Sequence, residues 1–184
     1  EKNSPLMSSE YDYKEEKFSE LSKFYGALKR DLKKNLIVRL HHDKTNKYTC
    51  EEKRWKDLDN TINLEFGYLP INKLIKKNRI TIFSYDSTGF LECLSQNIPA
   101  ILFIDSKELD TILNYEIKKD YELLKKTNIL FTNYSELCIH LEEVWDSVDL
   151  WWNSENNQKI IEDFTNKYCK TVSNPIKILN KILI

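Results

Sequence analysis

Small polar side chains gather in one short stretch where an anion could bind. Ser84, Asp86, Ser87 and Thr88 precede Gly89, and the stretch joins an apolar, strand-like run to the start of a helical pattern. The first backbone amides of a helix have no intrahelical acceptor, and the helix dipole adds partial positive charge there. Such a turn can hold a diphosphate through backbone N–H groups. Glycine-rich phosphate loops are excluded, because the whole chain holds 3 glycines.

A carboxylate lies close to this stretch. Glu92 falls one turn into the predicted helix, near enough to hydrogen-bond a ribose hydroxyl. The same residues also have an ordinary structural interpretation, since Ser, Thr and Asp are common N-cap residues and an early Glu complements the helix dipole. The sequence leaves both interpretations open.

A second polar cluster follows another apolar run and contains Arg39, His41 and His42. A guanidinium group can bind phosphate oxygens in a bidentate manner, and the imidazole of His41 can hydrogen-bond a phosphate or a base. Paired histidines at a strand end are also ordinary loop residues. We expect no metal site, because adjacent histidines on a strand or loop point apart and no third ligand is clustered with them.

Alternating strands and helices are expected to position these clusters. The apolar pattern predicts short strands at about residues 36–40, 62–66, 79–84, 99–104 and 129–131, and helices at about residues 14–34, 51–58, 71–77, 90–96, 109–126, 135–146 and 155–169. This alternation indicates βαβ units and a Rossmann-like three-layer α/β/α fold with a parallel sheet. In such folds ligands bind beyond the carboxyl ends of the strands. Both polar clusters fall at predicted strand ends.

The domain organisation is expected to be simple. Residues 1–13 are polar and are predicted to form an irregular linker, and residues 14–184 are predicted to form a single domain with a C-terminal helical arm. The chain starts with Glu rather than Met, so we expect it to begin inside a longer polypeptide. Tryptophans near the arm can stack on a base or a sugar, but packing is favoured for at least two of Trp145, Trp151 and Trp152.

Composition narrows the function classes. The chain has 28 basic and 29 acidic residues, and this near-balance argues against a nucleic-acid binder. Its 4 cysteines are dispersed and form no CxxC pair, which favours reduced thiols over a disulfide framework or a zinc site. No apolar run approaches the roughly 20 residues of a transmembrane helix. We expect a cytoplasmic protein, either free or peripheral at the inner face of the membrane.

Several segments follow one another in an order that identifies a family. They are NLIVRL at 35–40, GYLPI at 67–71, LI at 74–75, FSYDSTGFLE at 83–92, NIPAILF at 97–103, VWD at 144–146 and VDLWWNS at 148–154. Over roughly residues 15–180, this series resembles a family of bacterial transferases found with surface-polysaccharide genes. Members of that family look like GT-B glycosyltransferases, in which two Rossmann-like halves face each other across a cleft.

The resemblance implies that this chain is the C-terminal half of such an enzyme. That half binds the nucleotide-diphosphate sugar, without a metal or other cofactor, and an N-terminal half of the same protein binds the acceptor. The resemblance also implies a role for each polar cluster: Ser87, Thr88 and Gly89 face the diphosphate, Glu92 the ribose, and Arg39 with His41 a phosphate or the sugar. Ser84 and Asp86 complete the first cluster.

The chain also departs from the family's pattern. The N-terminal half is absent, and the first strand of the C-terminal half is missing or reduced to the irregular start. Catalytic bases of GT-B enzymes commonly come from the N-terminal half, so we expect an incomplete active site and identify no catalytic residue. Two alternatives stay open: a sugar-nucleotide epimerase-like domain, and a non-catalytic, degenerate half-domain that acts as a protein-interaction module.

Overall fold

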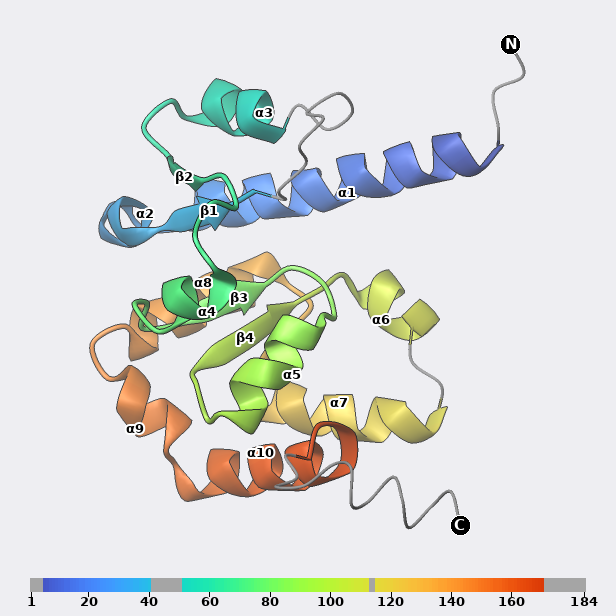
Figure 1. The fold of residues 1–184 in the computed structure, drawn as a ribbon, viewed down its shortest axis with the longest axis vertical. Helices are drawn as coiled ribbons and strands as arrows, with labels where there is room; N and C mark the ends of the chain where they lie inside the picture. The colour runs from blue at the N-terminus through green and yellow to red at the C-terminus, as the bar shows by residue number, and fades with distance from the viewer. Residues whose placement is uncertain (1–4, 41–50, 113–114, 171–184) are drawn as a thin grey trace.

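The computed structural model describes residues 5–40, 51–112 and 115–170 of the chain. The N-terminal part contains α1 (Pro5–Ala27), α2 (Arg30–Asn35), β1 (Ile37–Arg39), α3 (Glu51–Leu58), β2 (Asn63–Glu65) and α4 (Ile71–Ile75). The remainder contains β3 (Thr81–Phe83), α5 (Thr88–Ser95), β4 (Ala100–Phe103), α6 (Ser106–Ile112), α7 (Tyr115–Lys126), β5 (Leu130–Phe131), α8 (Tyr134–Val144), α9 (Val148–Trp152) and α10 (Glu155–Tyr168). Figure 1 shows their arrangement.

The described strands are parallel and fall into two sheets. β1 pairs with β2, in a register that places Ile37 opposite Asn63, and β3, β4 and β5 follow one another in a second sheet. The alternation of parallel strands with helices confirms the expected Rossmann-like α/β class. The sequence predicted a single sheet, whereas no backbone hydrogen bond in the described chain joins β1 to β3.

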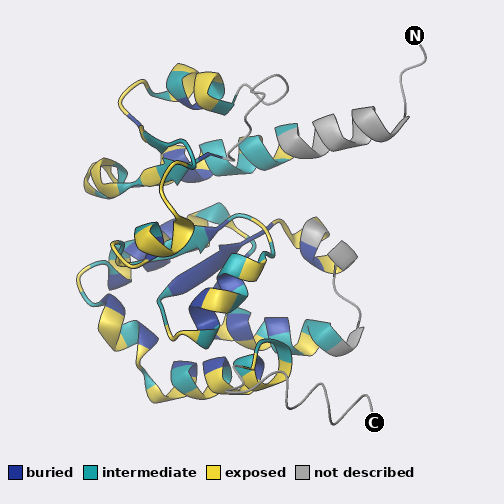
Figure 2. Ribbon diagram, in the orientation of Figure 1, coloured by how far each residue is buried: buried dark blue, intermediate teal, exposed yellow. Residues whose placement is uncertain are grey.

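β4 forms the centre of the larger sheet, and all of its residues are buried (Figure 2). A continuous apolar run is typical of a parallel strand covered on both faces. Ala100 and Leu102 pack with α5, α7 and α10, whereas Ile101 and Phe103 pack with α1 and α8. Figure 1 shows α5 in front of β4 and α8 behind it. This sheet therefore has helices on both faces, as the three-layer prediction requires.

Helix α1 packs against both sheets. Phe24 of α1 and Leu28, just after the helix, belong to the apolar cluster beneath β4, β5 and α8. Tyr25 instead packs with Leu40 and Trp55 in the cluster that supports β1, β2 and α3. Neighbouring residues of one helix lie about 100° apart around its axis, so a single helix can face both groups.

Several helix boundaries differ from the sequence pattern. α1 begins at Pro5, so most of the segment expected to be an irregular linker is helical. The helix expected over residues 14–34 is divided, because Lys29 is extended (φ −61°, ψ 150°) between α1 and α2. Lys33 Nζ donates to the carbonyl oxygen of Gly26 at 3.0 Å, which satisfies one of the last carbonyls of α1. The helix expected near residues 109–126 is likewise formed by α6 and α7.

The aromatic residues around α9 attach the C-terminal helices to the domain. Trp152 is 1% exposed, and its Nε1 donates to Asn97 Oδ1 at 2.8 Å. Trp151 Nε1 donates to the carbonyl oxygen of Thr127 at 3.1 Å, and its ring packs on that of Trp152. These contacts confirm packing roles for two of the three tryptophans. The guanidinium group of Arg79 lies over the third, Trp145.

Candidate functional site

The loop that follows β3 begins the candidate site, and Ser87 is the N-cap of α5. Its backbone is extended (φ −127°, ψ 155°), and its Oγ accepts a hydrogen bond from the amide of Phe90 at 3.4 Å. The carbonyl oxygen of Ser87 also accepts from Phe90, at 3.0 Å. The N-cap interpretation of Ser87 is therefore confirmed. The Oγ of Ser87 thus caps α5. The amides of Thr88 and Gly89 come before the first intrahelical hydrogen bond and so have no acceptor within the helix.

Gly89 lies in close contact with a buried ring. A Cβ atom at this position would lie 3.0 Å from Cε1 and 3.6 Å from Cζ of the Phe83 ring. Phe83 is the last residue of β3 and is buried against Phe90, with ring centroids 6.0 Å apart. The glycine lets the start of α5 sit directly on the end of β3, which fixes the first turn of the helix at the carboxyl edge of the sheet.

Asp86 ties this loop to α7. The hydroxyl of Tyr121 donates to Asp86 Oδ2 at 2.7 Å. Tyr121 is 6% exposed, and its burial, together with the hydrogen bond to Asp86, raises the pKa of the phenol well above its ordinary range. The phenol therefore stays protonated and remains a donor to the carboxylate. Asp86 consequently has a hydrogen-bond partner within the fold, and a ligand at this loop would have to share the Asp86 carboxylate with Tyr121.

The remaining residues of this cluster differ in exposure. Thr88 and Glu92 are exposed, and Ser84 is half-buried. Within the part of the chain that the structure describes, the side chains of these residues make no hydrogen bond or ion pair. Thr88 and Glu92 are therefore accessible to a ligand from solvent, as the predicted roles require.

Three helices begin at the same edge of the sheet. β3, β4 and β5 are parallel, so α5, α6 and α8 start beside one another, and a polar side chain caps the first turn of each. Asp105 Oδ1 accepts from the amide of Lys107 at 2.6 Å, before α6. Asn133 Oδ1 accepts from the amides of Ser135 at 2.8 Å and Glu136 at 3.3 Å, at the start of α8. Backbone donors and the positive ends of helix dipoles are thus concentrated at this edge.

Sequence reasoning singled out Ser87 and passed over the caps of α6 and α8. The signal that could have found Asp105 and Asn133 was the same in both cases, namely a short acidic or amide side chain directly after an apolar strand and just before a helix.

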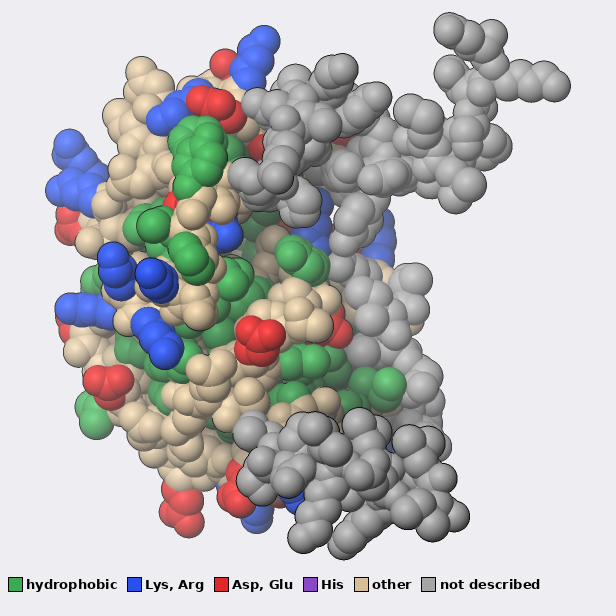
Figure 3. Space-filling view, in the orientation of Figure 1, with side chains coloured by type: hydrophobic (Ala, Val, Ile, Leu, Met, Phe, Trp, Pro, Cys, Tyr) green, Lys and Arg blue, Asp and Glu red, His purple; other side chains and the backbone are tan. Residues whose placement is uncertain are grey.

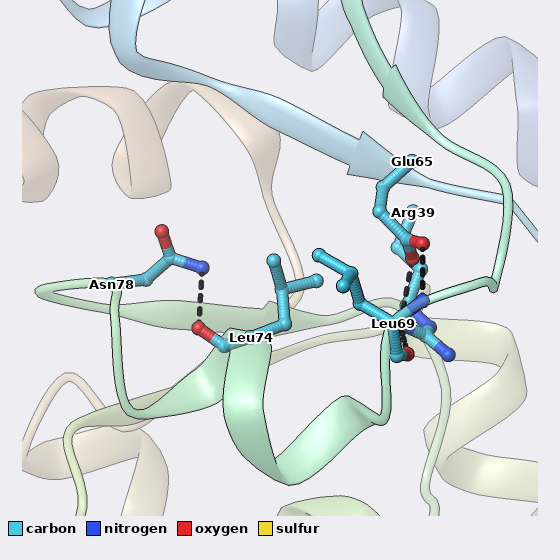
Figure 4. Close-up of polar contacts among 5 residues, drawn as sticks. All are labelled: Arg39, Glu65, Leu69, Leu74 and Asn78. Carbon is cyan, nitrogen blue, oxygen red and sulfur yellow. Dashed lines mark hydrogen bonds and ion pairs between the residues drawn. The ribbon is translucent and has the colours of Figure 1, made fainter.

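Arg39 lies at the end of β1 and is held by the neighbouring strand and loop (Figure 4). Its Nη1 donates to Glu65 Oε2 at 2.7 Å and to the carbonyl oxygen of Leu69 at 2.8 Å. Glu65 Oε1 accepts from the amide of Leu69 at 3.0 Å. Burial works to raise the pKa of Glu65, but the amides of the following loop and the charge of Arg39 outweigh it and lower that pKa.

The Arg39–Glu65 pair therefore shapes the loop between β2 and α4. A phosphate group at Arg39 would have to share the guanidinium with a carboxylate, so the predicted role of Arg39 stays a prediction. His41 lies outside the described residues, and so does its neighbour His42. Among the contacts that the structure describes, none joins Arg39 to the Ser84–Gly89 loop. The two predicted clusters lie on different sheets.

Basic and apolar side chains gather around α4, where sequence reasoning proposed nothing. Figure 3 shows Lys and Arg side chains grouped over this helix. The basic residues are the exposed lysines 73, 76 and 77, and residues 66–80 contain no Asp or Glu. Tyr68, Leu69 and Ile71 are exposed beside them. Three of the large apolar side chains on the described surface thus lie within four consecutive residues.

The described residues offer little support for nucleophilic or metal chemistry. Burial raises the pKa of the Cys93 thiol to about 11, with a smaller contribution from the charge of Glu92, so this thiol is not activated. No group of three His, Cys, Asp or Glu side chains in the described ranges could hold a metal ion. None of the described helices is both long enough and apolar enough to span a bilayer.

Comparison with known proteins gives one match. A family model described as "LIC12162 family transferase" matches residues 5–183 of the chain. No curated protein and no solved structure matches it.

Proposed function

Because the chain belongs to the LIC12162 family of transferases, we propose that it is the donor-binding half of a GT-B-type glycosyltransferase. The donor is a nucleotide-diphosphate sugar, and the acceptor belongs to surface-polysaccharide synthesis. The observation that carries this proposal is the convergence of α5, α6 and α8 at the carboxyl edge of a parallel sheet. Open α/β sheets bind their ligands at this edge.

The chemistry of the proposed reaction matches this edge. Glycosyl transfer breaks the bond between the sugar and the diphosphate, and negative charge builds up on the departing diphosphate. Backbone amides that already point at that position stabilise the charge without reorganising. Thr88 and Gly89 would supply such amides from the first turn of α5, with Ser87 holding the turn through its bond to Phe90. No metal ion is needed for this stabilisation.

The remaining predicted residues receive roles that fit their exposure. The exposed carboxylate of Glu92 would accept hydrogen bonds from the ribose. Arg39 would approach the phosphates or the sugar from the end of β1, and His41, which lies outside the described residues, is proposed for the same role. The exposed Tyr68, Leu69 and Ile71 offer an apolar surface on which the acceptor-binding half of the protein would pack.

A charge change at the N-cap tests the donor site sharply. Ser87→Asp keeps a good N-cap residue but adds a negative charge at the first turn, whereas Ser87→Asn is a neutral cap of similar shape. The chain would be titrated with UDP, CDP and GDP, with binding followed by NMR chemical shifts and thermal shift. We expect saturable binding of one nucleotide, weakened about tenfold or more by Ser87→Asp and little by Ser87→Asn, because like charges repel at this range.

The control for net charge is Ser154→Asp, at the N-cap of α10. α10 begins on the opposite side of the molecule from the start of α5 (Figure 1), so this variant should bind the nucleotide as the parent chain does. Equal weakening by Ser87→Asp and Ser154→Asp would refute a local phosphate site. A folded chain that binds none of the nucleotides at millimolar concentration would overturn the proposal.

A further inference from the structure

Among the described strands, β1 and β3 each have one edge that pairs with no other strand. The amide of Leu40 donates to the carbonyl oxygen of Glu65 at 2.8 Å, toward β2. Successive amides along a strand point in opposite directions, so those of Ile37 and Arg39 point away from β2. The amide of Thr81 likewise donates toward β4, to the carbonyl oxygen of Pro99 at 3.2 Å. By the same alternation, the amide of Ile82 points away from β4.

These two edges face each other. The strands follow one another in the order β2, β1, β3 and β4 in Figure 1, and β1 and β3 run in the same direction in Figures 1 and 4. In the described ranges no backbone hydrogen bond crosses between them. Figure 3 shows apolar side chains at the surface in the band between the two sheets.

The residues of these edges have the character of interior strands. β1 lies in the apolar run of residues 36–40, yet Ile37 is 42% exposed. β3 contains no charged residue and no proline, the usual devices that protect an edge strand from pairing. The hydroxyl oxygen of Thr81 is buried without a hydrogen-bond partner among the described residues. Apart from Arg39 at the end of β1, both strands are free of charged residues, but among the described strands each has one neighbour where the central β4 has two.

The position of α1 indicates what lies between them. α1 runs in the direction opposite to β1, which follows it after α2, as the helix of a βαβ unit does (Figure 1). Its Leu21 contacts both the cluster under β4 and the cluster under β1, and so does Leu36. In a βαβ unit the helix covers the join between the two strands that it connects. Here the helix and its second strand are present, and the first strand of such a unit would fall between β1 and β3.

We propose that an extended apolar segment binds between β1 and β3, parallel to both, and joins the five described strands into one six-stranded sheet. The order would be β2, β1, the added strand, β3, β4 and β5. The occupant is a run of about five β-branched or aliphatic residues that leads into the N-terminal end of α1. This inference does not rest on the proposed function, because it concerns the sheet and not its ligand.

The proposed strand would also unite the two polar clusters. Its carboxyl end would lie between Arg39 and Ser84, at the point where the strand order reverses, which is where open α/β sheets bind ligands. The two clusters belong to separate sheets until this strand is in place. A complete sheet would therefore bring both to one continuous edge.

The test adds an apolar strand to the chain and measures the hydrogen exchange of backbone amides at the two edges. The full chain would be extended at its N-terminus by about six Val and Ile residues and a Gly/Ser linker of about ten residues. The control carries the same extension with proline at two alternate positions, because proline lacks the amide donor. Hydrogen exchange at individual amides would be read by NMR in the unextended chain and in both extended chains.

We expect exchange at Ile37, Arg39 and Ile82 to slow by about tenfold or more in the chain with the apolar extension and not in the proline control. The amides of Leu40 and Thr81, already bonded to β2 and β4, provide internal references and should change much less. The proposal is overturned if the three edge amides are already as protected as the references in the unextended chain. It also fails if both extensions act alike, or if protection requires dimerisation in sedimentation, since the occupant would then be a second copy.

Discussion

A buried histidine gives a quantitative prediction about acid stability. His140 lies on α8, is 4% exposed, and packs between the rings of Phe131 and Trp151, with centroid distances of 5.3 and 4.8 Å. Its Nε2 has no hydrogen-bond partner within the described residues. Burial lowers the pKa of His140 from 6.5 to about 4, because the charged imidazolium would lose its hydration. The imidazole is therefore neutral in the folded protein near pH 7.

The pKa difference fixes both the sign and the size of the effect. As the pH falls below 6.5, the unfolded chain binds a proton at this residue before the folded chain does. The stability is thus fully present above pH 6.5 and is lost progressively down to pH 4. At about 1.4 kcal/mol per pH unit, the loss reaches roughly 2.5 kcal/mol near pH 4.5 and about 3 kcal/mol in the limit.

Urea unfolding at about pH 7, 5.5 and 4.5 would measure this loss, with His140→Leu as the comparison. Carboxylates contribute equally to both proteins, so the difference between their pH profiles isolates the histidine. The free energy of unfolding of the parent chain should fall more steeply than that of His140→Leu, by roughly 2.5 kcal/mol over this range. Parallel profiles for the two proteins would show that His140 binds its proton over the same pH range in the folded and the unfolded chain, and would refute the lowered pKa.

Two further predictions concern the loop and the helices around the candidate site. Tyr121→Phe removes the hydrogen bond to Asp86 and should lower the free energy of unfolding, measured by urea titration, by about 1–2 kcal/mol. The control Tyr85→Phe, at an exposed ring, should change it by less than about 0.5 kcal/mol. Similar losses from both variants would contradict a stabilising role for the Tyr121–Asp86 bond. Gly26→Ala should stabilise the protein by about 0.5–1 kcal/mol, because nothing lies within 4 Å of the new Cβ. Gly89→Ala gains the same helix propensity but places its Cβ 3.0 Å from a buried ring, so its midpoint of thermal unfolding should lie below that of Gly26→Ala; the reverse order would show that the ring yields freely.

Local sequence patterns predicted a strand or helix well where the apolar run or the capping residues lie within that element or directly beside it. The apolar run that contains β4 predicted a strand there, and the polar residues before α5 predicted its start, because strand patterning and helix capping depend on neighbours in sequence. The predicted site residues that the structure describes are therefore near the expected strand ends.

What the sequence could not predict depends on partners distant in the chain. The sequence predicts that Arg39 can bind phosphate oxygens, but it does not predict the register of β1 against β2, which sets Arg39 opposite Glu65 and pairs the two. Asp86 was expected to face a ligand, yet it accepts from Tyr121, 35 residues away. Such pairings depend on how distant segments of the chain are arranged in the fold. The apolar periodicity of the sequence does not contain that information.

The attachment of α10 has a consequence for how the protein is made. The cluster that holds α5 and α7 is completed by Ile161 and Phe164, which the ribosome adds more than sixty residues after Phe90 and Leu94. During synthesis the nascent chain therefore carries an uncovered apolar face from the moment α5 emerges until α10 follows. This interval is when chaperones would find the chain, and when a stalled polypeptide would be most prone to aggregate.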